Sequence, residues 1–214
     1  MTPKAATLAR IVLVAALAGS GPAGAADVSP AGEKLAAALD SMRVEDLWIA
    51  KHRVSWKTGE PLGGQPTDGK GHTHCSAFVA AFCLRQDIYI LRPPEHSSTL
   101  LANAQFDWLS GEGRSQGWKP VGSAVEAQHL ANRGFVVVAA YKEGDARKPG
   151  HIAVVRPSAK SDRSVEKEGP QIAQAGTTNY ANATLEEGFR HHPAAWKSRS
   201  VRFFAHEPVQ PPNG

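Results

Sequence analysis

The apolar run at residues 75–82 (CSAFVAAF) most constrains the fold, because it has the length of a helix and begins with a thiol. A helix that is apolar almost all round must be covered by other elements, so we expect it to lie in the core. The polar residues before Cys75 predict that the helix begins there, and its apolar pattern ends near Gln86. The start of a helix carries partial positive charge, which favours a thiolate at Cys75.

A second run, residues 150–155 (GHIAVV), predicts a buried strand with His151 at its first position. A thiol becomes a strong nucleophile when a nearby base removes its proton, and imidazole is the usual base. The sequence therefore predicts a catalytic pair, in which Cys75 is the nucleophile and His151 is the general base.

Residues 171–175 (QIAQA) predict the next strand and supply a third polar group. Alternation along a strand places Ile172 and Gln174 on one face. A glutamine that shares a face with isoleucine is expected to have a polar partner, and His151 on the neighbouring strand is suitable. Such a partner fixes the tautomer and orientation of an imidazole. Gln174 is thus the first candidate for the third catalytic residue, and Asn179 is the alternative.

The N-terminal 25 residues have the pattern of a secretory signal peptide. Lys4 and Arg10 form a basic region before an apolar stretch at residues 11–18 (IVLVAALA). This stretch is too short to span a bilayer. Small residues at positions 23–25 (AGA) form a typical cleavage site. We therefore expect a mature protein that is periplasmic or secreted and has no stable membrane anchor.

The charge balance argues against nucleic acid as a partner. The chain has 24 basic and 20 acidic residues, and two of the basic ones lie in the predicted signal peptide, which leaves a net charge of about +2. No basic stripe interleaved with aromatic residues is found. We expect no nucleic-acid partner and no cofactor.

The two cysteines, Cys75 and Cys83, are predicted to be free thiols. They are eight positions apart on one predicted helix, so their Cα atoms should be about 12 Å apart at the usual helical rise. A disulfide needs less than about 7 Å. Cys83 falls inside the apolar run and is expected to be a core residue.

The remaining histidines offer weaker candidates. His72, His74 and Cys75 carry the donor atoms of a zinc site, but adjacent residues on a helix point in different directions and the usual spacer is missing. We therefore expect no metal. His191 and His192 are expected to be a solvated pair.

The order of the predicted elements indicates an α+β fold, because helices come first and antiparallel strands follow. We expect one domain over residues 26–207, and a Pro-rich, disordered tail at 208–214. A Gly-rich loop is predicted at 58–72 and a charged, exposed loop at 158–169. Helices are predicted at 31–42, 75–86, 97–109 and 124–133, with a short one at 184–189, and strands at 135–141, 151–156, 171–175 and 201–206.

These motifs resemble those of a known group of enzymes. Residues 74–79 (HCSAFV) resemble the Asp-Cys-Ser-Gly-Phe-Val motif of the NlpC/P60 cysteine peptidases. Residues 149–154 (PGHIAV) are similar to the Gly-His-Val strand of that family and of the CHAP amidases. Gln174 falls where these families place their third polar residue. The resemblance covers roughly residues 72–176, and it departs from the motif at His74, where the family has aspartate, and at Ala77, where it has glycine.

The resemblance implies a papain-like fold, with an N-terminal helical part packed on an antiparallel sheet. It also implies hydrolysis of an amide bond through an acyl-enzyme at Cys75, in peptides or in the stem peptides of peptidoglycan. The oxyanion hole should include the backbone N–H of Cys75, and Gln65 and His72 are the candidates for the second donor. Two alternatives remain: an acyl or amide transferase on the same fold, and a catalytically silent cell-wall-binding domain.

Overall fold

The computed structural model describes residues 26–64 and 72–208 of the 214-residue chain. The described elements are, in chain order, α1 (Pro30–Ser41), α2 (Cys75–Arg85), α3 (Leu101–Ser110), the 3-10 helix η1 (Glu112–Gln116), β1 (Lys119–Val121), α4 (Ala124–Asn132), β2 (Val136–Tyr141), β3 (His151–Val155), α5 (Asp162–Glu168), β4 (Gln171–Gln174), β5 (Tyr180–Thr184), α6 (Leu185–Gly188), α7 (Pro193–Lys197) and β6 (Arg202–His206). The predicted signal peptide, the oxyanion candidate Gln65 and residues 209–214 of the predicted tail lie outside the described residues.

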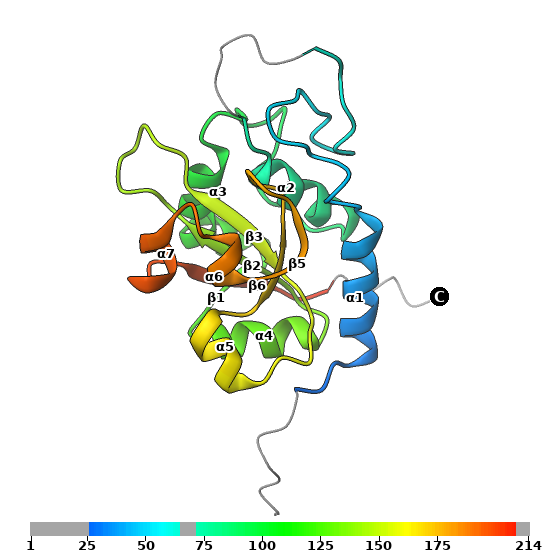
Figure 1. Cartoon of the computed structure of the whole chain (residues 1–214), viewed down its shortest axis with the longest axis vertical. Helices are drawn as coiled ribbons and strands as arrows, with labels where there is room; N and C mark the ends of the chain where they lie inside the picture. The colour runs from blue at the N-terminus through cyan, green and yellow to red at the C-terminus, as the bar shows by residue number, and fades with distance from the viewer. Residues whose placement is uncertain (1–25, 65–71, 209–214) are drawn as a thin grey trace, which may run out of the picture.

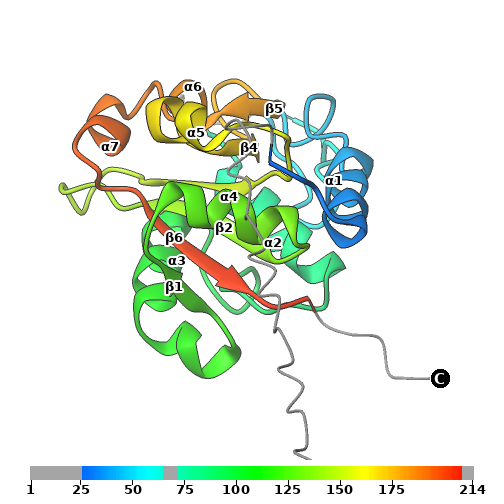
Figure 2. The same cartoon turned by 90° about the horizontal axis from the view of Figure 1, so that it is seen from below.

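The strands within the described ranges form one six-stranded sheet in the order β1-β6-β2-β3-β4-β5. Each neighbouring pair is antiparallel. In Figure 2, β6 is the red strand that lies between β1 and β2. The predicted α+β class and its antiparallel sheet are thus confirmed.

Helices cover both faces of this sheet, so the chain forms three layers (Figure 1). Because side chains alternate along a strand, Ile152 and Val154 of β3 pack on one face against α1, α2 and α3. Ala153 and Val155 pack on the other face against α4, α6 and α7. The buried helix α2 lies between the sheet and the segment at residues 44–56, and its middle is fully buried.

Two short helices, α4 and α6, begin at side-chain caps. Ser123 Oγ accepts a hydrogen bond from the Glu126 N–H at the start of α4, at 3.0 Å. Thr184 Oγ1 accepts one from the Glu187 N–H at the start of α6, at 3.1 Å. These caps satisfy N–H groups that the first turn of a helix leaves unpaired. The second cap also fixes the position of α6, which lies against β4.

Five of the described elements were not predicted, namely η1, β1, α5, β5 and α7. The segments of α5, β5 and β1 lack a strong hydrophobic pattern. Helix α5 occupies the stretch expected to be a charged loop, because Ser161 caps it and Val165 is its one buried residue. Strand β5 contains small and polar residues at the sheet edge. Strand β1 has three residues, KPV, and pairs only with β6.

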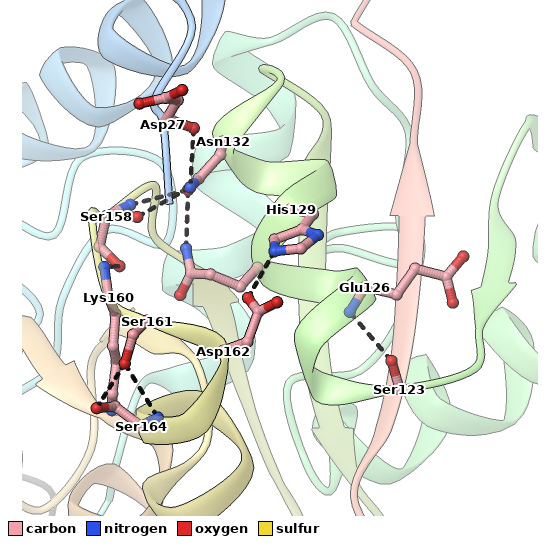
Figure 3. Close-up of polar contacts among 11 residues, drawn as sticks. Asp27, Ser123, Glu126, His129, Asn132, Ser158, Lys160, Ser161, Asp162 and Ser164 are labelled. Carbon is pink, nitrogen blue, oxygen red and sulfur yellow. Dashed lines mark hydrogen bonds and ion pairs between the residues drawn. The ribbon is translucent and has the colours of Figure 1, made fainter. Parts of the chain in front are cut away.

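A network of polar side chains on α4 ties distant segments together (Figure 3). The Asn132 amide donates hydrogen bonds to the Ser158 carbonyl at 2.9 Å and to the Asp27 carbonyl at 3.3 Å. Its Oδ1 accepts from the Ser158 N–H and from the Gln128 amide. Both amide side chains are buried, so each polar atom needs such a partner. This network holds the segment before α1 against the loop after β3.

Over residues 26–64 and 72–208, we find no helix with the length and apolar character needed to cross a membrane.

Candidate active site

Cys75 is the first residue of α2, and its side chain is buried with 6 % exposed. The preceding residue, His74, does not cap the helix with its side chain; its Nε2 donates to the His52 carbonyl at 3.0 Å instead. Burial raises the pKa of the Cys75 thiol, while the backbone N–H groups of Ile152, Ser76 and Cys75 itself act in the opposite direction. The sulfur therefore lies where main-chain donors can stabilise negative charge.

His151 is the first residue of β3, as predicted, and is paired with Tyr141 of β2. It is 5 % exposed, and its Nε2 lies 2.7 Å from Oε1 of Gln174. Burial lowers the pKa of the imidazole, and the Gln174 hydrogen bond partly raises it. At neutral pH both the thiol and the imidazole are therefore uncharged.

The partners of Gln174 determine which tautomer His151 adopts. The Gln174 Nε2 group donates to the Gly188 carbonyl at 3.1 Å and to the Thr178 carbonyl at 3.3 Å. Because only the NH2 end of the amide can face these carbonyls, the Oε1 end faces the imidazole. The oxygen must accept, so Nε2 of His151 carries the proton. Its Nδ1 then carries a lone pair, which is the form that a general base requires.

Gln174 is packed closely by a glycine of α6. A Cβ atom at Gly188 would lie 2.8 Å from Oε1 of Gln174 and would also overlap the end of Ile172. Position 188 therefore needs glycine so that the helix backbone can approach the amide. The prediction that Ile172 and Gln174 share a face is confirmed, because both lie against this residue.

The start of β3 is held by Asn103 of α3, which is buried. Its Oδ1 accepts the N–H of Gly150 at 2.9 Å, and its Nδ2 donates to the Lys148 carbonyl at 2.9 Å. A Cβ at Gly150 would overlap the Tyr141 carbonyl, so this close contact also requires glycine. Sequence reasoning did not identify Asn103, because nothing in its own segment indicates a partner 47 residues away.

The thiol and the imidazole lie at the same end of β3 but are not bonded to each other. Cys75 packs with the α2 side of the sheet and lies near the Ile152 N–H, one residue beyond His151. His151 packs on the side of α6. Among the described residues, no hydrogen bond joins Sγ of Cys75 to Nδ1 of His151. A reaction between them requires a movement that brings the thiol to Nδ1, and such contacts often form only with substrate bound.

Two rings from the segment after α6 cover His151, and the sequence did not indicate either. Phe189 meets the imidazole edge-on, with ring centroids 4.6 Å apart. The His192 ring is stacked on it at 5.6 Å, with 18° between the planes. The prediction of a solvated pair is wrong for His192, which is half-buried, whereas His191 is exposed.

Asn179, the alternative third residue, lies elsewhere and has a different set of partners. Its Nδ2 donates to the carbonyls of Val44 at 2.7 Å and Leu47 at 2.8 Å, and its Oδ1 accepts from the Gly176 N–H. These bonds join the turn after β4 to the segment before α2. Of the two candidates, Gln174 is the one whose side chain is hydrogen-bonded to His151.

A cleft of about 490 Å³ opens beside the first turn of α2. Its walls come from the segments at 52–62, 72–77 and 93–101, and Trp56, His72 and Ser76 are among the lining side chains. The described lining includes neither Cys75 nor His151, although Cys75 lies between two lining residues. Trp56 thus lies at the surface of the cleft. Trp118 is buried and donates to the Tyr89 carbonyl, so it is a core residue.

The other predicted features of the site have mixed outcomes. His72, a candidate oxyanion donor, is exposed at the cleft and its carbonyl accepts the Lys51 N–H at 2.8 Å. Cys75 and Cys83 are free, as predicted, and burial raises the pKa of Cys83 to about 12. In the described part of the chain, no three or more His, Cys, Asp or Glu residues are grouped to hold a metal ion.

Comparison of the sequence with models of protein families and with curated proteins gives no match. The likeness to the NlpC/P60 and CHAP enzymes thus rests on the short motifs around Cys75, His151 and Gln174.

Proposed function

We propose that the protein is an exported cysteine hydrolase with a papain-like catalytic arrangement, which cleaves an amide bond through an acyl-enzyme at Cys75. One observation carries the proposal. A neutral His151 is fixed by Gln174 so that Nδ1 is its unprotonated nitrogen, at the end of β3 where the Cys75 thiol also lies. The proposed substrates are peptides or the stem peptides of peptidoglycan, in agreement with the sequence motifs.

The reaction follows from the protonation states of the two groups. Nδ1 of His151 takes the thiol proton while the Cys75 sulfur attacks the amide carbonyl carbon. The developing oxyanion is stabilised by the backbone N–H of Cys75 at the start of α2. His151 then donates its proton to the leaving amine as the C–N bond breaks, which gives a thioester. Water attacks the thioester with His151 again acting as base, and the acid is released.

The neutral resting state affects the expected reactivity. Because burial raises the pKa of Cys75 and lowers that of His151, no thiolate–imidazolium pair is present before substrate binds. The thiol proton must therefore pass to His151 during the reaction itself. The cleft beside α2 is the proposed site for the part of the substrate next to the scissile bond, since residues on both sides of Cys75 line it.

The direct test is to digest purified peptidoglycan with the protein and to identify the released fragments by mass spectrometry. New amine and carboxylate termini at one kind of amide bond are expected, together with their complete loss in Cys75→Ala. Circular dichroism of the variant should match the wild type, because the thiol is a small part of the core. Unchanged turnover by Cys75→Ala on a confirmed substrate would falsify the proposal.

Chemical labelling separates a hydrolase from a silent binding domain. Iodoacetamide at pH 7 should modify Cys75, and tandem mass spectrometry can compare it with Cys83 in the same tryptic peptide, residues 71–85. Cys83 is the internal control, because its pKa of about 12 keeps it protonated. His151→Ala should slow the labelling of Cys75 alone. Equal labelling in wild type and His151→Ala would favour the binding domain.

The transferase alternative is tested by adding an amine to the reaction. A transferase would form an amide product in place of the free acid.

A further inference from the structure

We propose that His192 is a positioning residue for the proposed reaction, whose ring holds the His151 imidazole in its reactive plane and shields it from water. This inference rests on the proposed function, because it assigns a role relative to the base. The observation that carries it is the near-parallel stack of the two imidazole rings, at 5.6 Å and 18°.

The His192 ring completes an enclosure around His151. Phe189 contacts the imidazole edge-on from one direction, and the hydrogen bond to Gln174 fixes one ring nitrogen. A single hydrogen bond leaves an imidazole free to rotate about the bond axis, whereas a stacked ring restricts that rotation. Together the three contacts determine both the direction and the plane of His151, so Nδ1 points in one direction.

His192 is itself held in place by neighbours on β2 and after α6. Its ring lies 5.5 Å from the ring of Tyr141, and its Nδ1 lies 4.0 Å from a carboxylate oxygen of Glu143. Its backbone N–H donates to the Phe189 carbonyl at 2.7 Å. The ring is thus packed between Tyr141 and His151, with its polar edge facing Glu143.

The charge state of His192 suits a positioning role. Burial, with a smaller repulsion from His151, lowers its pKa to about 4, while Glu143 acts to raise it and His191 to lower it. His192 is therefore neutral throughout the range in which His151 must accept a proton. A charged ring in this place would oppose formation of the His151 imidazolium, and the neutral ring does not.

The test measures two properties in purified full-length protein: the pKa of His151 by NMR titration, and the rate of Cys75 modification by iodoacetamide as a function of pH. His192→Ala removes the stacked ring and exposes His151 to water and to Glu143. Both effects raise the pKa of His151, so the acid limb of the rate profile should move to higher pH. The rate at pH 7 should fall by about tenfold, because the imidazole is no longer held in one plane.

Matched variants decide whether loss of the stacked ring causes the changes in the His151 pKa and in the Cys75 labelling rate. His192→Phe keeps a flat ring and should retain the wild-type pKa of His151 and a rate within about threefold of wild type. His191→Ala, at the exposed neighbour, should change neither. His192→Gln keeps a polar side chain without a ring and should behave like alanine, which covers the case in which His192→Ala does not fold.

Two results would overturn the inference. The first is an unchanged His151 pKa and labelling rate in His192→Ala or His192→Gln, and the second is an equal loss in His192→Phe. Failure of the proposed function is a distinct result, because labelling of Cys75 would then be insensitive to His151→Ala as well. If labelling depends on His151 but not on His192, only the positioning role is wrong.

Discussion

Asn103 accepts a hydrogen bond from the backbone N–H of Gly150 at 2.9 Å, one residue before the proposed base His151. The amide is buried, and it also donates to the Lys148 carbonyl. Asn103→Ala leaves both backbone groups without this partner, so it should lower the free energy of unfolding by about 1–3 kcal/mol. It should also lower activity, because the start of β3 is no longer held by α3.

Chemical denaturation and kcat/KM measurements test this prediction. The matched control is Asn182→Ala, which makes the same substitution at an exposed position of β5 and should change the free energy of unfolding by less than about 0.5 kcal/mol. Similar losses in the two variants would show that the contact to Gly150 contributes nothing specific.

Gln174→Ala should reduce kcat/KM by about 10–100-fold, the effect of losing one supporting hydrogen bond of about 1.5–3 kcal/mol. Gln174→Glu should also be impaired, because a carboxylate oxygen would replace the NH2 group that faces the carbonyls of Gly188 and Thr178. Steady-state kinetics of both variants, with the NMR titration of His151, provide the measurement. Full activity in Gln174→Ala would remove Gln174 from the mechanism.

Asn179→Ala separates the two candidates for the third residue. Because its amide joins Val44 and Leu47 to the turn after β4, the substitution should lower the thermal midpoint while leaving the pKa of His151 unchanged. The His151 titration should move in Gln174→Ala instead. A shift in the pKa of His151 in Asn179→Ala, with no shift in Gln174→Ala, would contradict the structure.

Gly188→Ala should damage the site without touching either reacting group. Its new Cβ would lie 2.8 Å from Oε1 of Gln174, closer than side chains pack, so the amide must move away from His151. The expected result is a loss of activity similar to that of Gln174→Ala. Gly144→Ala is the control, since a Cβ at that glycine meets no atom within 4 Å. If Gly188→Ala retains wild-type kinetics, α6 does not fix the amide.

Stability should fall as the solution is acidified from pH 6.5 towards pH 4, partly because of His192. Its pKa is about 4 in the folded protein and about 6.5 in an unfolded chain, so the unfolded state binds more protons between these values. The contribution of neutral His192 to the free energy of unfolding is therefore fully present above pH 6.5 and is lost as the pH falls to 4. His192→Phe, which cannot titrate, should lose less stability than wild type over this range in denaturation at pH 7 and pH 4.5. Parallel pH dependence in the two proteins would contradict the lowered pKa.

Features with a strong local pattern could be predicted from the sequence. The apolar run after Cys75, the buried run after Gly150 and the alternation around Ile172 each determine an element and the face on which it packs. The contact between His151 and Gln174 followed from that alternation, because a buried amide needs a polar partner.

Contacts that depend on tertiary packing could not be predicted. His192 follows a four-residue helix, and its polar neighbours in the sequence suggest a solvated position. It becomes half-buried because α6 lies against β4 and β5, and because the following segment places its ring between those of Tyr141 and His151.

The cleft beside α2 has walls made mainly of loops, whereas the groups proposed to carry out the chemistry lie on α2, β3 and β4. Arg53, Leu62 and Ser98 are exposed members of these walls outside the six-stranded sheet, so we expect substitutions there to leave the hydrogen bond between His151 and Gln174 intact. Libraries confined to these walls should yield many folded variants that differ in substrate preference. Under the proposed function, evolution or design could thus change substrate selectivity at these walls separately from the proposed catalytic groups.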